Sequence, residues 1–463
     1  MTIEIINDFV NKVKEIVGHH QGYEFYGDFY PTEQGIIHLS SFFRYNFEVV
    51  ALFRYEYIAE IKKEDFWNAV PPQNIPLQYY VFTNGLTHLV YTPKKRKVLE
   101  TEDVSELLDM LIKEKGNTKT EQLRNEIITT IEQSVTDFFN TSSLQNHPLG
   151  KKEKSIKSFF TKANLKKNLI YNGIENYFHF SQDIRDLNNF ENSFFKTLID
   201  TLDSNQDVYR YTTLDTVFAT VNNASIRMNG IVGMNDISEI EYLESYLDDK
   251  FDIYSNSESL NEINKKFILC ASVLQDDLLE WRLYGDDSKG ACLVFSISES
   301  KIPGIQIRKV NYGVRDKNLK NSHPELDLLK KIIDDVKTKC DQTLKFRTLT
   351  IWKHFFKSFE YTSEQEVRLL TILSSNNNIK GEKISGDNAH NIQKQWCLTA
   401  SHKILTPFIT LPLADNAFPM QLKKIILGSK CPEKIINQKQ FSQLLSAKNI
   451  HASVEISRVT NYR

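Results

Sequence analysis

Two strand-like runs on either side of Asn84-Gly85 constrain the fold of this chain more tightly than any other feature. The run LQYYVFT precedes this pair and LTHLVYT follows it, and both runs are rich in β-branched and aromatic residues. Asn and Gly tolerate the positive φ angles that a two-residue hairpin turn requires. We therefore predict an antiparallel hairpin that turns at Asn84-Gly85, within a strand-rich segment over residues 22–100.

The apolar spacing changes after this segment and divides the chain of 463 residues. Over residues 102–140 apolar side chains recur every three or four positions, which indicates helices. The following residues are rich in Ser, Asn, Pro, Gly and Lys, as in a surface linker. We predict an α+β domain over 1–140, a linker with a helical connector over 141–204, and a second domain over 205–463.

The second domain alternates strand-like and helical segments without the regular rhythm of a parallel βαβ fold. Strand-like runs include VYRY, FILCASVL, VRLLTIL and LKKIILG, and a long helix is expected over residues 324–359. Such a mixture is typical of an α+β fold with a mixed sheet. We expect each of the two domains to bury its own core.

Composition limits the classes of function that the chain can have. No apolar run has membrane-spanning length, and the N-terminal segment lacks the layout of a signal peptide, so we expect a cytoplasmic protein with no membrane partner. The five cysteines are scattered without a CxxC pair, which argues against a disulfide framework and a zinc site. A net charge of -2 provides no long-range attraction for nucleic acid, although local basic patches leave nucleic-acid binding open.

Several motifs of the second domain occur in an order that resembles a known bacterial family. They are VYRYTTLDTVFATVNNASIRM, Asn235-Asp236, FILCASVLQDDLLEWRLYGDDSKGACLVF, FKSFEYTSEQEVRLLTI, LKKIILGSKC and SRVTNYR. This order resembles the family catalogued as domain of unknown function 2971, over about residues 205–463. The chain departs from that family around Asn235-Asp236, where Met234 and Ile237 replace the usual Phe and Pro. The resemblance itself implies no activity, so the chemistry must be argued from the residues.

Three positions of this domain also follow the motif order of the ADP-ribosyltransferase superfamily. Arg210 lies on the opening strand, Tyr284 follows in the middle, and Glu364-Gln365-Glu366 heads a late strand. The resemblance implies an ADP-ribosyltransferase-like domain with NAD as its substrate. Breaking the bond between ribose and nicotinamide builds positive charge on the sugar, which a fixed carboxylate stabilises. Glu366 is the expected catalytic carboxylate, and Glu364 is its partner in macromolecular transfer.

The remaining predicted residues would bind the nucleotide. Arg210 is suited to the pyrophosphate, because its guanidinium can donate two parallel hydrogen bonds. Tyr284 would stack on the nicotinamide ring, and Trp281, three residues earlier on the same helix face, would form the other wall. Tyr209 and Lys289 complete this predicted set, and Gly285 would let the chain turn away from the ligand.

An alternative interpretation assigns these residues no function. Arg210 would then lie on the surface of an edge strand, and Trp281 with Tyr284 would anchor a helix to the core. Glu364 and Glu366 would face solvent, with Arg368 paired to one of them. A WxxY pair on a helix serves packing more often than it lines a pocket.

The first domain suggests a different class of activity. Glu60 and Lys62 form an ExK motif, Asp28 lies upstream, and the strand YYVFTNGLTHLVYT resembles the TNG-bearing strand of the nuclease domain in type I restriction subunits. In that restriction-endonuclease-like fold Asp28 and Glu60 would hold Mg²⁺ while Lys62 supports the attacking water. Glu60 and Lys62 also fit an ordinary charged surface segment, so the other possibilities are a nuclease-like but inactive sensing or docking domain and an unrelated α+β domain.

Three hypotheses of function result from the sequence. The first is a bacterial effector that cleaves NAD or transfers ADP-ribose to a cellular target, by analogy in phage defence. The second is a Mg²⁺-dependent nuclease or a nucleic-acid sensor that acts through the first domain. The third is a non-enzymatic binding or scaffold protein. The transferase depends on Glu366, the nuclease on Asp28 and Glu60, and the scaffold on neither.

Overall fold

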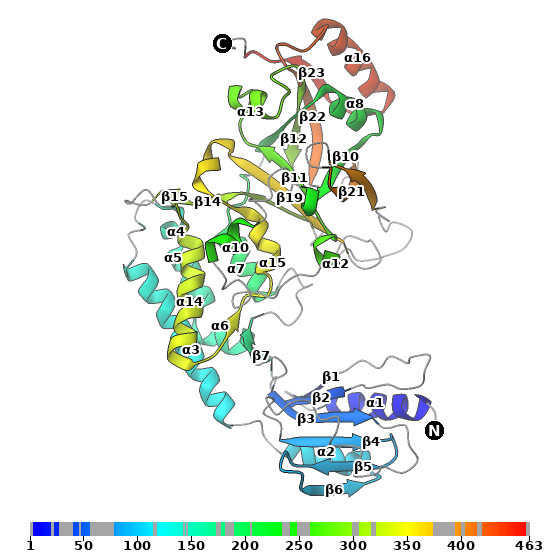
Figure 1. Cartoon of the computed structure of the whole chain (residues 1–463), viewed down its shortest axis with the longest axis vertical. Helices are drawn as coiled ribbons and strands as arrows, with labels where there is room; N and C mark the ends of the chain where they lie inside the picture. The colour runs from blue at the N-terminus through cyan, green and yellow to red at the C-terminus, as the bar shows by residue number, and fades with distance from the viewer. Residues whose placement is uncertain are drawn as a thin grey trace. The chain divides into compact units, whose positions relative to one another are not determined.

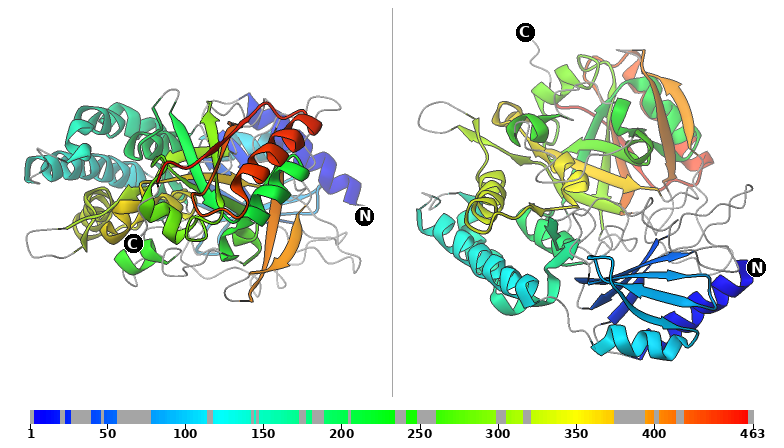
Figure 2. Two further views of the ribbon diagram at one scale, coloured as in Figure 1. Left: turned by 90° about the horizontal axis from the view of Figure 1, so that it is seen from above. Right: turned by 60° about the horizontal axis from the view of Figure 1, so that its bottom comes forward.

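The computed structural model divides the chain into two compact units, which are described separately (Figures 1 and 2). The first unit comprises residues 1–137, 160–180 and 332–345, and the second comprises 138–159, 181–331 and 346–463. The structure describes residues 3–19, 23–26, 40–45, 48–55, 78–113, 118–141, 144, 147–172, 177–180, 189–203, 206–233, 241–247, 260–298, 305–315, 321–373, 394–399, 403–413 and 419–459.

The first unit is built on a six-stranded sheet with the strands in sequence order. The strands are β1 (Tyr23–Tyr26), β2 (Ser40–Tyr45), β3 (Glu48–Tyr55), β4 (Tyr79–Thr83), β5 (His88–Tyr91) and β6 (Lys97–Thr101). All neighbours are antiparallel except β3 and β4, which are parallel. Helices α1 (Ile3–Gly18) and α2 (Val104–Lys113) lie on one face of this sheet (Figure 1). Their apolar side chains form one core with those of the strands.

The predicted hairpin is present as β4 and β5, but its turn differs by one residue from the prediction. Thr83 pairs with His88, and Asn84 N donates to the Thr87 carbonyl, so Gly85 and Leu86 are the two central residues of the turn. Gly85 has a φ of 88°. Asn84 supports the turn through its side chain, because Asn84 Oδ1 accepts hydrogen bonds from the main-chain N–H groups of Leu86 and Thr87.

The rest of the first unit comes from distant parts of the chain. Helix α3 (Thr118–Thr141) begins in this unit, and α6 (Lys162–Asn168) follows it there. A small sheet contains β7 (Ile170–Asn172), β8 (Tyr177–His179) and β17 (Leu344–Lys345), the last of which is parallel to β8. The segment expected to be a helical connector therefore also contains strands, because Tyr177 and Phe178 bury their rings in this small sheet.

The second unit contains a ten-stranded mixed sheet, as expected for an α+β fold. Its strands are β9 (Asp207–Thr212), β10 (Ser225–Gly230), β11 (Lys266–Ser272), β12 (Ala291–Ile297), β13 (Ile305–Lys309), β19 (Glu366–Ile372), β20 (Gln395–Leu398), β21 (Leu405–Pro412), β22 (Met420–Leu427) and β23 (Ser453–Ile456). The order is β20-β21-β10-β11-β9-β12-β22-β23, and β19 pairs with both β11 and β13. This sheet is separate from the sheet of the first unit.

Both faces of the β9-β12-β22 part of the sheet are covered. On one face, Val217 and Val221 of α8 (Leu214–Asn222) and Phe441 and Leu445 of α16 (Lys434–Ala447) belong to the main core, together with Leu293 and other strand residues. On the opposite face, Trp281 of α13 (Leu278–Leu283) packs with a smaller cluster of Tyr209, Tyr211, Cys292, Val294 and Ile426. Strand alternation thus divides the side chains between two helical layers.

Short elements complete the second unit. They are α4 (Pro148–Lys151), α5 (Glu153–Phe159), α7 (Phe190–Leu198), η2 (Ile231–Gly233), α10 (Tyr242–Leu247), α12 (Leu260–Ile263), β14 (Asn311–Tyr312), β15 (Val314–Arg315), β16 (Asn321–Ser322), α15 (Leu349–Trp352), η4 (Lys353–Phe355), β18 (Phe356–Lys357) and η5 (Phe359–Glu364).

The long helix expected over residues 324–359 is wrong in its C-terminal part. Helix α14 spans only Pro324–Cys340, and Asp341 then adopts a left-handed conformation with a φ of 51°. The chain continues into β17 and the short helices α15 and η4. The apolar periodicity persists beyond Cys340 because the side chains of Phe346, Leu349 and Phe355 remain buried, so periodicity alone does not reveal the break.

Two further findings relate to the composition. Within the described residues, no helix is both long enough and apolar enough to cross a bilayer. All five cysteines are free thiols.

Substitution of Gly85 tests the turn of the first sheet. Alanine at this position would adopt an unfavourable positive φ, and its Cβ would lie 2.9 Å from Ile5 Cγ2 on α1. We expect Gly85→Ala to lower the free energy of unfolding of this unit by about 1 to 2 kcal/mol. Hydrogen exchange of the β4 and β5 amides in the full chain measures this loss. Leu86→Ala is the control, since Leu86 is exposed, and equal protection in both variants would contradict the assignment of the turn.

Candidate functional site

The candidate site lies along one edge of β11, between the part of this edge that pairs with β10 and the part that pairs with β9. Strand β19 pairs along the whole of one edge of β11, from Lys266 to Ser272. On the other edge, β10 pairs at residues 267–268 and β9 pairs only through Ser272 and Tyr209. Among the described residues, positions 269–271 of this edge therefore have no strand partner. Strands β9 and β10 separate here, and a cavity opens between them.

Arg210 of β9 spans this gap. Arg210 Nη1 donates a 2.7 Å hydrogen bond to the carbonyl oxygen of Cys270 on β11. The side chain thus makes a contact that a backbone N–H would make in a continuous sheet. The guanidinium is held in a fixed place on the wall of the cavity.

The cavity has a volume of about 370 Å³, which is within the usual range for small-molecule sites. Its lining comes from β9, β10, η2, β11, α13, β18, η5 and β19. The lining residues with charged, hydroxyl or amide groups are Tyr209, Arg210, Tyr211, Asn229, Ser272, Glu280, Tyr284, Lys357, Tyr361, Glu364 and Glu366. A cavity with both cations and carboxylates suits a ligand that is itself polar and charged.

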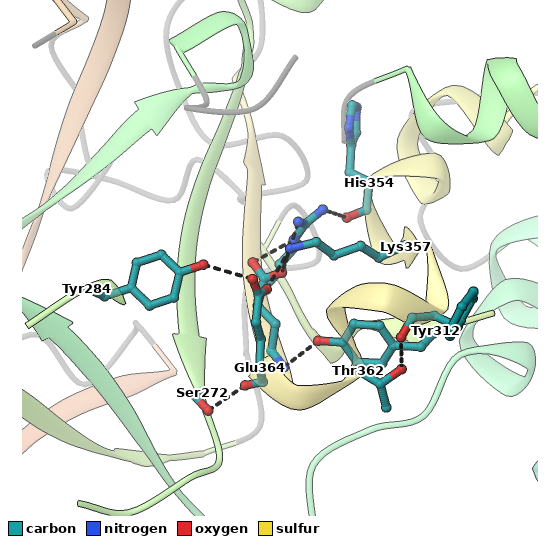
Figure 3. Close-up of polar contacts among 10 residues, drawn as sticks. Ser272, Tyr284, Tyr312, His354, Lys357, Thr362 and Glu364 are labelled. Atoms are coloured by element: carbon teal, nitrogen blue, oxygen red, sulfur yellow. Dashed lines mark hydrogen bonds and ion pairs between the residues drawn. The ribbon is translucent and has the colours of Figure 1, made fainter. Parts of the chain in front are cut away.

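The Glu364-Gln365-Glu366 motif lies at the junction of η5 and β19. Gln365 between the two acids has a left-handed backbone, with φ 42° and ψ 50°. Ser272 Oγ donates a 2.7 Å hydrogen bond to the Glu364 carbonyl, and Glu366 N donates a 2.7 Å hydrogen bond to Tyr312 Oη (Figure 3). The main chain is therefore fixed on both sides of Gln365, and both carboxylates line the cavity.

Two buried cations, Lys357 and Arg368, hold these carboxylates, and Figure 3 labels Lys357 and Glu364. Lys357 Nζ lies 2.6 Å from Glu364 Oε2 and 3.3 Å from Glu366 Oε2. Arg368 Nε and Nη2 donate to the two oxygens of Glu366 at 2.8 and 2.9 Å, and Arg368 Nη1 donates to the His354 carbonyl. Two positive and two negative charges thus form one buried network, which we call the ion network.

The ion network keeps Glu366 ionised. Burial by itself raises the pKa of a carboxyl group, but the guanidinium of Arg368 and the ammonium of Lys357 outweigh burial and hold the pKa of Glu366 below its ordinary value. The alternative in which Arg368 pairs with one glutamate is right about this pairing. Its prediction that Glu364 and Glu366 face solvent is wrong, since both glutamates are buried and line the cavity.

Glu280 of α13 is a third acid in the cavity. Its environment favours the protonated form, whereas the environment of Glu366 favours the ionised form. Only 4% of Glu280 is exposed, and its Oε1 has no hydrogen-bond partner among the described residues. Burial, followed by the negative charges of Glu364 and Asp277, raises the pKa of Glu280 to about 8. Glu280 is therefore protonated at neutral pH, close to two carboxylates that are held by cations.

Two tyrosines complete the polar wall. Tyr284 Oη donates a 2.8 Å hydrogen bond to Glu364 Oε1, although 43% of this residue is exposed (Figure 3). Burial of the phenol and the adjacent Glu364 carboxylate raise the pKa of Tyr284, so it remains a hydrogen-bond donor. Lys357 Nζ lies 4.3 Å from the centre of the Tyr361 ring. Tyr284 thus lines the same cavity as Arg210 and Glu366.

The predicted role of Trp281 as a wall of the ligand slot is wrong. Trp281 is fully buried and meets Tyr211 edge-to-face, with ring centres 5.0 Å apart. Its face of α13 packs on the sheet, whereas Tyr284, at the C-terminal end of the helix, reaches the cavity. Gly285 is required by this packing, because a Cβ there would lie 2.5 Å from Trp281 Cε3.

Asp276 fixes α13 to the C-terminal part of the chain. Asp276 Oδ1 accepts hydrogen bonds from Trp281 Nε1 at 2.8 Å and from Ser457 Oγ at 2.6 Å. Asp276 Oδ2 accepts from Arg458 N at 2.9 Å. On the other side, Tyr211 Oη donates to the Leu274 carbonyl and accepts from the main-chain N–H of the helix-capping Asp277. These contacts orient Glu280 and Tyr284.

Of the other two predicted binding residues, Tyr209 and Lys289, only the first lines the cavity. Tyr209 lines the cavity from β9. Lys289 is exposed and is not part of the lining; it follows a turn in which Asp286, Asp287 and Ser288 all have positive φ angles. The turn after Tyr284 leads away from the cavity, and its Ser288 is buried against Gly428 at the far end of β22.

Some predicted residues lie outside the described part of the chain. Asp28, Glu60 and Lys62, which carry the nuclease hypothesis, are among them, as are Asn235 and Asp236. Within the described residues no group of three or more His, Cys, Asp and Glu side chains is arranged to hold a metal ion.

The cavity residues that were not anticipated from the sequence include Ser272, Glu280 and Lys357. Ser272 ends a clear strand, which places it near the motif of the neighbouring strand. Lys357 precedes Glu364 by seven residues but lies on β18, not on one helix with it, so only the fold of β18 and η5 brings them together. Glu280 is one of several acids in a charged run, and its burial depends on how α13 packs.

Comparisons with known proteins give no match for this chain: no family model, curated protein or solved structure matches it.

The ion network predicts a large loss of stability on removal of its central charge. Glu366→Gln leaves the Arg368 guanidinium buried without its carboxylate, so we expect the free energy of unfolding to fall by about 3 kcal/mol. Chemical denaturation of the full chain measures this change. Glu360→Gln is the control, because Glu360 is an exposed glutamate of η5 and should change the stability by less than about 0.5 kcal/mol. Equal stability of the two variants would show that the network does not support the fold.

The raised pKa of Glu280 predicts a second effect, on the pH dependence of stability. The protonated form is favoured in the folded state, so its contribution is complete below the ordinary pKa of 4.5 and is lost as the pH rises through about 8. Glu280→Gln cannot titrate. We expect the variant to gain stability relative to the wild type between pH 5 and pH 9, as measured by urea denaturation at several pH values. Parallel pH curves would contradict the assignment.

Proposed function

We propose that the cavity of the second unit binds NAD and breaks the bond between nicotinamide and ribose, passing ADP-ribose to water or to a macromolecular target. The observation that carries this proposal is the convergence of Arg210, Tyr284, Glu364 and Glu366 on one cavity. These four residues were selected from their order in the sequence alone. Although these residues also make contacts that support the fold, they line one cavity together, so that a single charged ligand would contact all of them.

The carboxylates supply the electrostatic part of this reaction. Positive charge develops on the ribose as the bond to nicotinamide breaks, and a preorganised negative group next to the sugar lowers the barrier. Glu366 has both oxygens bound by Arg368, whereas Glu364 is balanced only by Lys357 and the Tyr284 phenol. The motif order implied Glu366 as the catalytic carboxylate; because of these contacts we instead assign the stronger field at the sugar to Glu364, with Glu366 fixing Lys357 and, through it, Glu364.

The other lining groups suit the rest of the nucleotide. The Arg210 guanidinium, held by the Cys270 carbonyl, is preorganised for charge-assisted hydrogen bonds to the pyrophosphate. Tyr284 and Tyr361 provide aromatic faces for the nicotinamide ring. The proposed setting is the cytosol of a bacterial cell, and a role in defence against phage is proposed on analogy alone.

Incubation of the full-length protein with NAD tests this function. Chromatography should detect nicotinamide together with ADP-ribose or an ADP-ribosylated protein. Glu364→Gln keeps the size and one hydrogen-bonding oxygen but removes the charge, so we expect the rate to fall by about 10²- to 10³-fold. Glu360→Gln, on the exposed side of η5, should retain the wild-type rate.

Two results would contradict the proposal. One is that the wild type releases no nicotinamide at any pH tested and with any of the protein fractions supplied as targets. The other is an equal rate in Glu364→Gln and Glu360→Gln, which would remove the carboxylate from the reaction.

A further inference from the structure

Glu280 has no task in the cleavage of NAD as proposed above. The nicotinamide ring of NAD carries a positive charge while it is bonded to ribose. When the bond breaks, the electron pair moves to the ring nitrogen, and nicotinamide leaves as a neutral molecule without gaining a proton. A proton donor is needed only where the departing base would otherwise leave as an anion.

The geometry nevertheless presents Glu280 as such a donor. Glu280 lines the cavity, is 4% exposed, and has an oxygen, Oε1, with no hydrogen-bond partner among the described residues. Its helix is fixed at the N-terminal end by Asp277, whose side chain accepts from the N–H groups of Leu279 and Glu280 at 2.8 and 3.2 Å. A carboxyl group held at the wall of a polar cavity without a protein partner is available to a ligand.

The surroundings of Glu280 determine its protonation. The groups that act on it or are acted on by it are Asp277 of its own helix, Glu364 of η5, Glu366 of β19, Lys357 of β18, Tyr211 of β9, Cys292 of β12 and Tyr284. Burial comes first and the carboxylates next, and together they outweigh the one cation and raise the pKa to about 8. The proton is therefore retained at neutral pH and can be given up to a base.

We propose that the same cavity also hydrolyses the N-glycosidic bond of purine nucleotides, with Glu280 as the acid that protonates the departing base. This inference rests on the proposed function, since the carboxylate that stabilises the sugar is shared. Uncharged purines are the class that requires this proton, because a ring nitrogen of the base can accept it. Arg210 would bind the phosphate, and the tyrosine rings would stack on the base.

The reaction balances as a hydrolysis. The bond between ribose C1′ and the base nitrogen breaks, and its electron pair goes to the base. The Glu280 carboxyl transfers its proton to a ring nitrogen of the base, which leaves neutral. Water adds its oxygen to C1′ and gives up one proton, which restores the Glu280 carboxyl. The products are the free base and ribose phosphate.

The test compares two substrates with the full-length protein. AMP and NAD are incubated separately from pH 6 to pH 9, and adenine and nicotinamide are measured by chromatography. We expect adenine release from AMP to be constant at low pH and to fall about tenfold for each pH unit above about 8, as the acid loses its proton. Nicotinamide release should not follow this fall.

Glu280→Gln distinguishes an acid from a structural residue. We expect adenine release from AMP to fall by about 100-fold and the ratio of adenine release to nicotinamide release to fall at least about tenfold. A residue that only supports the fold would lower both rates together and leave the ratio unchanged, which would overturn the inference. Glu360→Gln is the control and should leave both rates at the wild-type level.

The remaining outcomes separate the two proposals. Nicotinamide release without adenine release from AMP at any pH would overturn the purine activity while supporting the cleavage of NAD. Adenine release with the expected pH dependence but without nicotinamide release would support the acid and overturn NAD as the substrate. Absence of both products would overturn both.

Discussion

The second unit depends on a buried balance of charge. Two carboxylates and Lys357 at one wall of the cavity, together with the buried Arg368, have given up most of their contact with water. This burial is costly unless every charge is paired and hydrogen-bonded. Glu364, Glu366, Lys357 and Arg368 meet this condition through short contacts among themselves. The pairing fixes β18, η5 and the first residues of β19 relative to one another. It also sets the electrostatic potential that any ligand in the cavity experiences.

The same balance explains why three acids in one small space behave differently. The cations lie next to Glu364 and Glu366, whereas Glu280 faces the carboxylates from α13 without a cation of its own. Ionisation of Glu280 would therefore add a third negative charge in a site with little water. Environments that separate the pKa values of neighbouring acids are the usual basis for assigning one as a proton donor and another as a charge stabiliser. Both proposals for the function of this cavity derive from that separation.

Local sequence patterns predicted the strands and the hairpin better than they predicted how these elements pack against one another. The runs around Asn84-Gly85 and the strands at residues 207–212 and 266–272 were recognisable because propensity and apolar pattern agree there. The convergence of Arg210 with Glu366 was anticipated only through motif order. The burial of Trp281 was expected only under the alternative interpretation, and the position of Lys357 was not predicted, because each depends on which face of a short element packs against a distant segment. Periodicity also failed at Cys340, where buried side chains continue beyond the end of the helix.

The attachment of α13 through Asp276 relates the cavity to the order in which the chain is synthesised. Asp276 orients the helix that carries Glu280 and Tyr284, and two of its hydrogen-bond partners, Ser457 and Arg458, are far downstream of every residue that lines the cavity. During translation these residues leave the ribosome long after Glu366. The wall formed by α13 therefore lacks its final support on the nascent chain. A reactive cavity would acquire its finished shape only after nearly all of this sequence had been made.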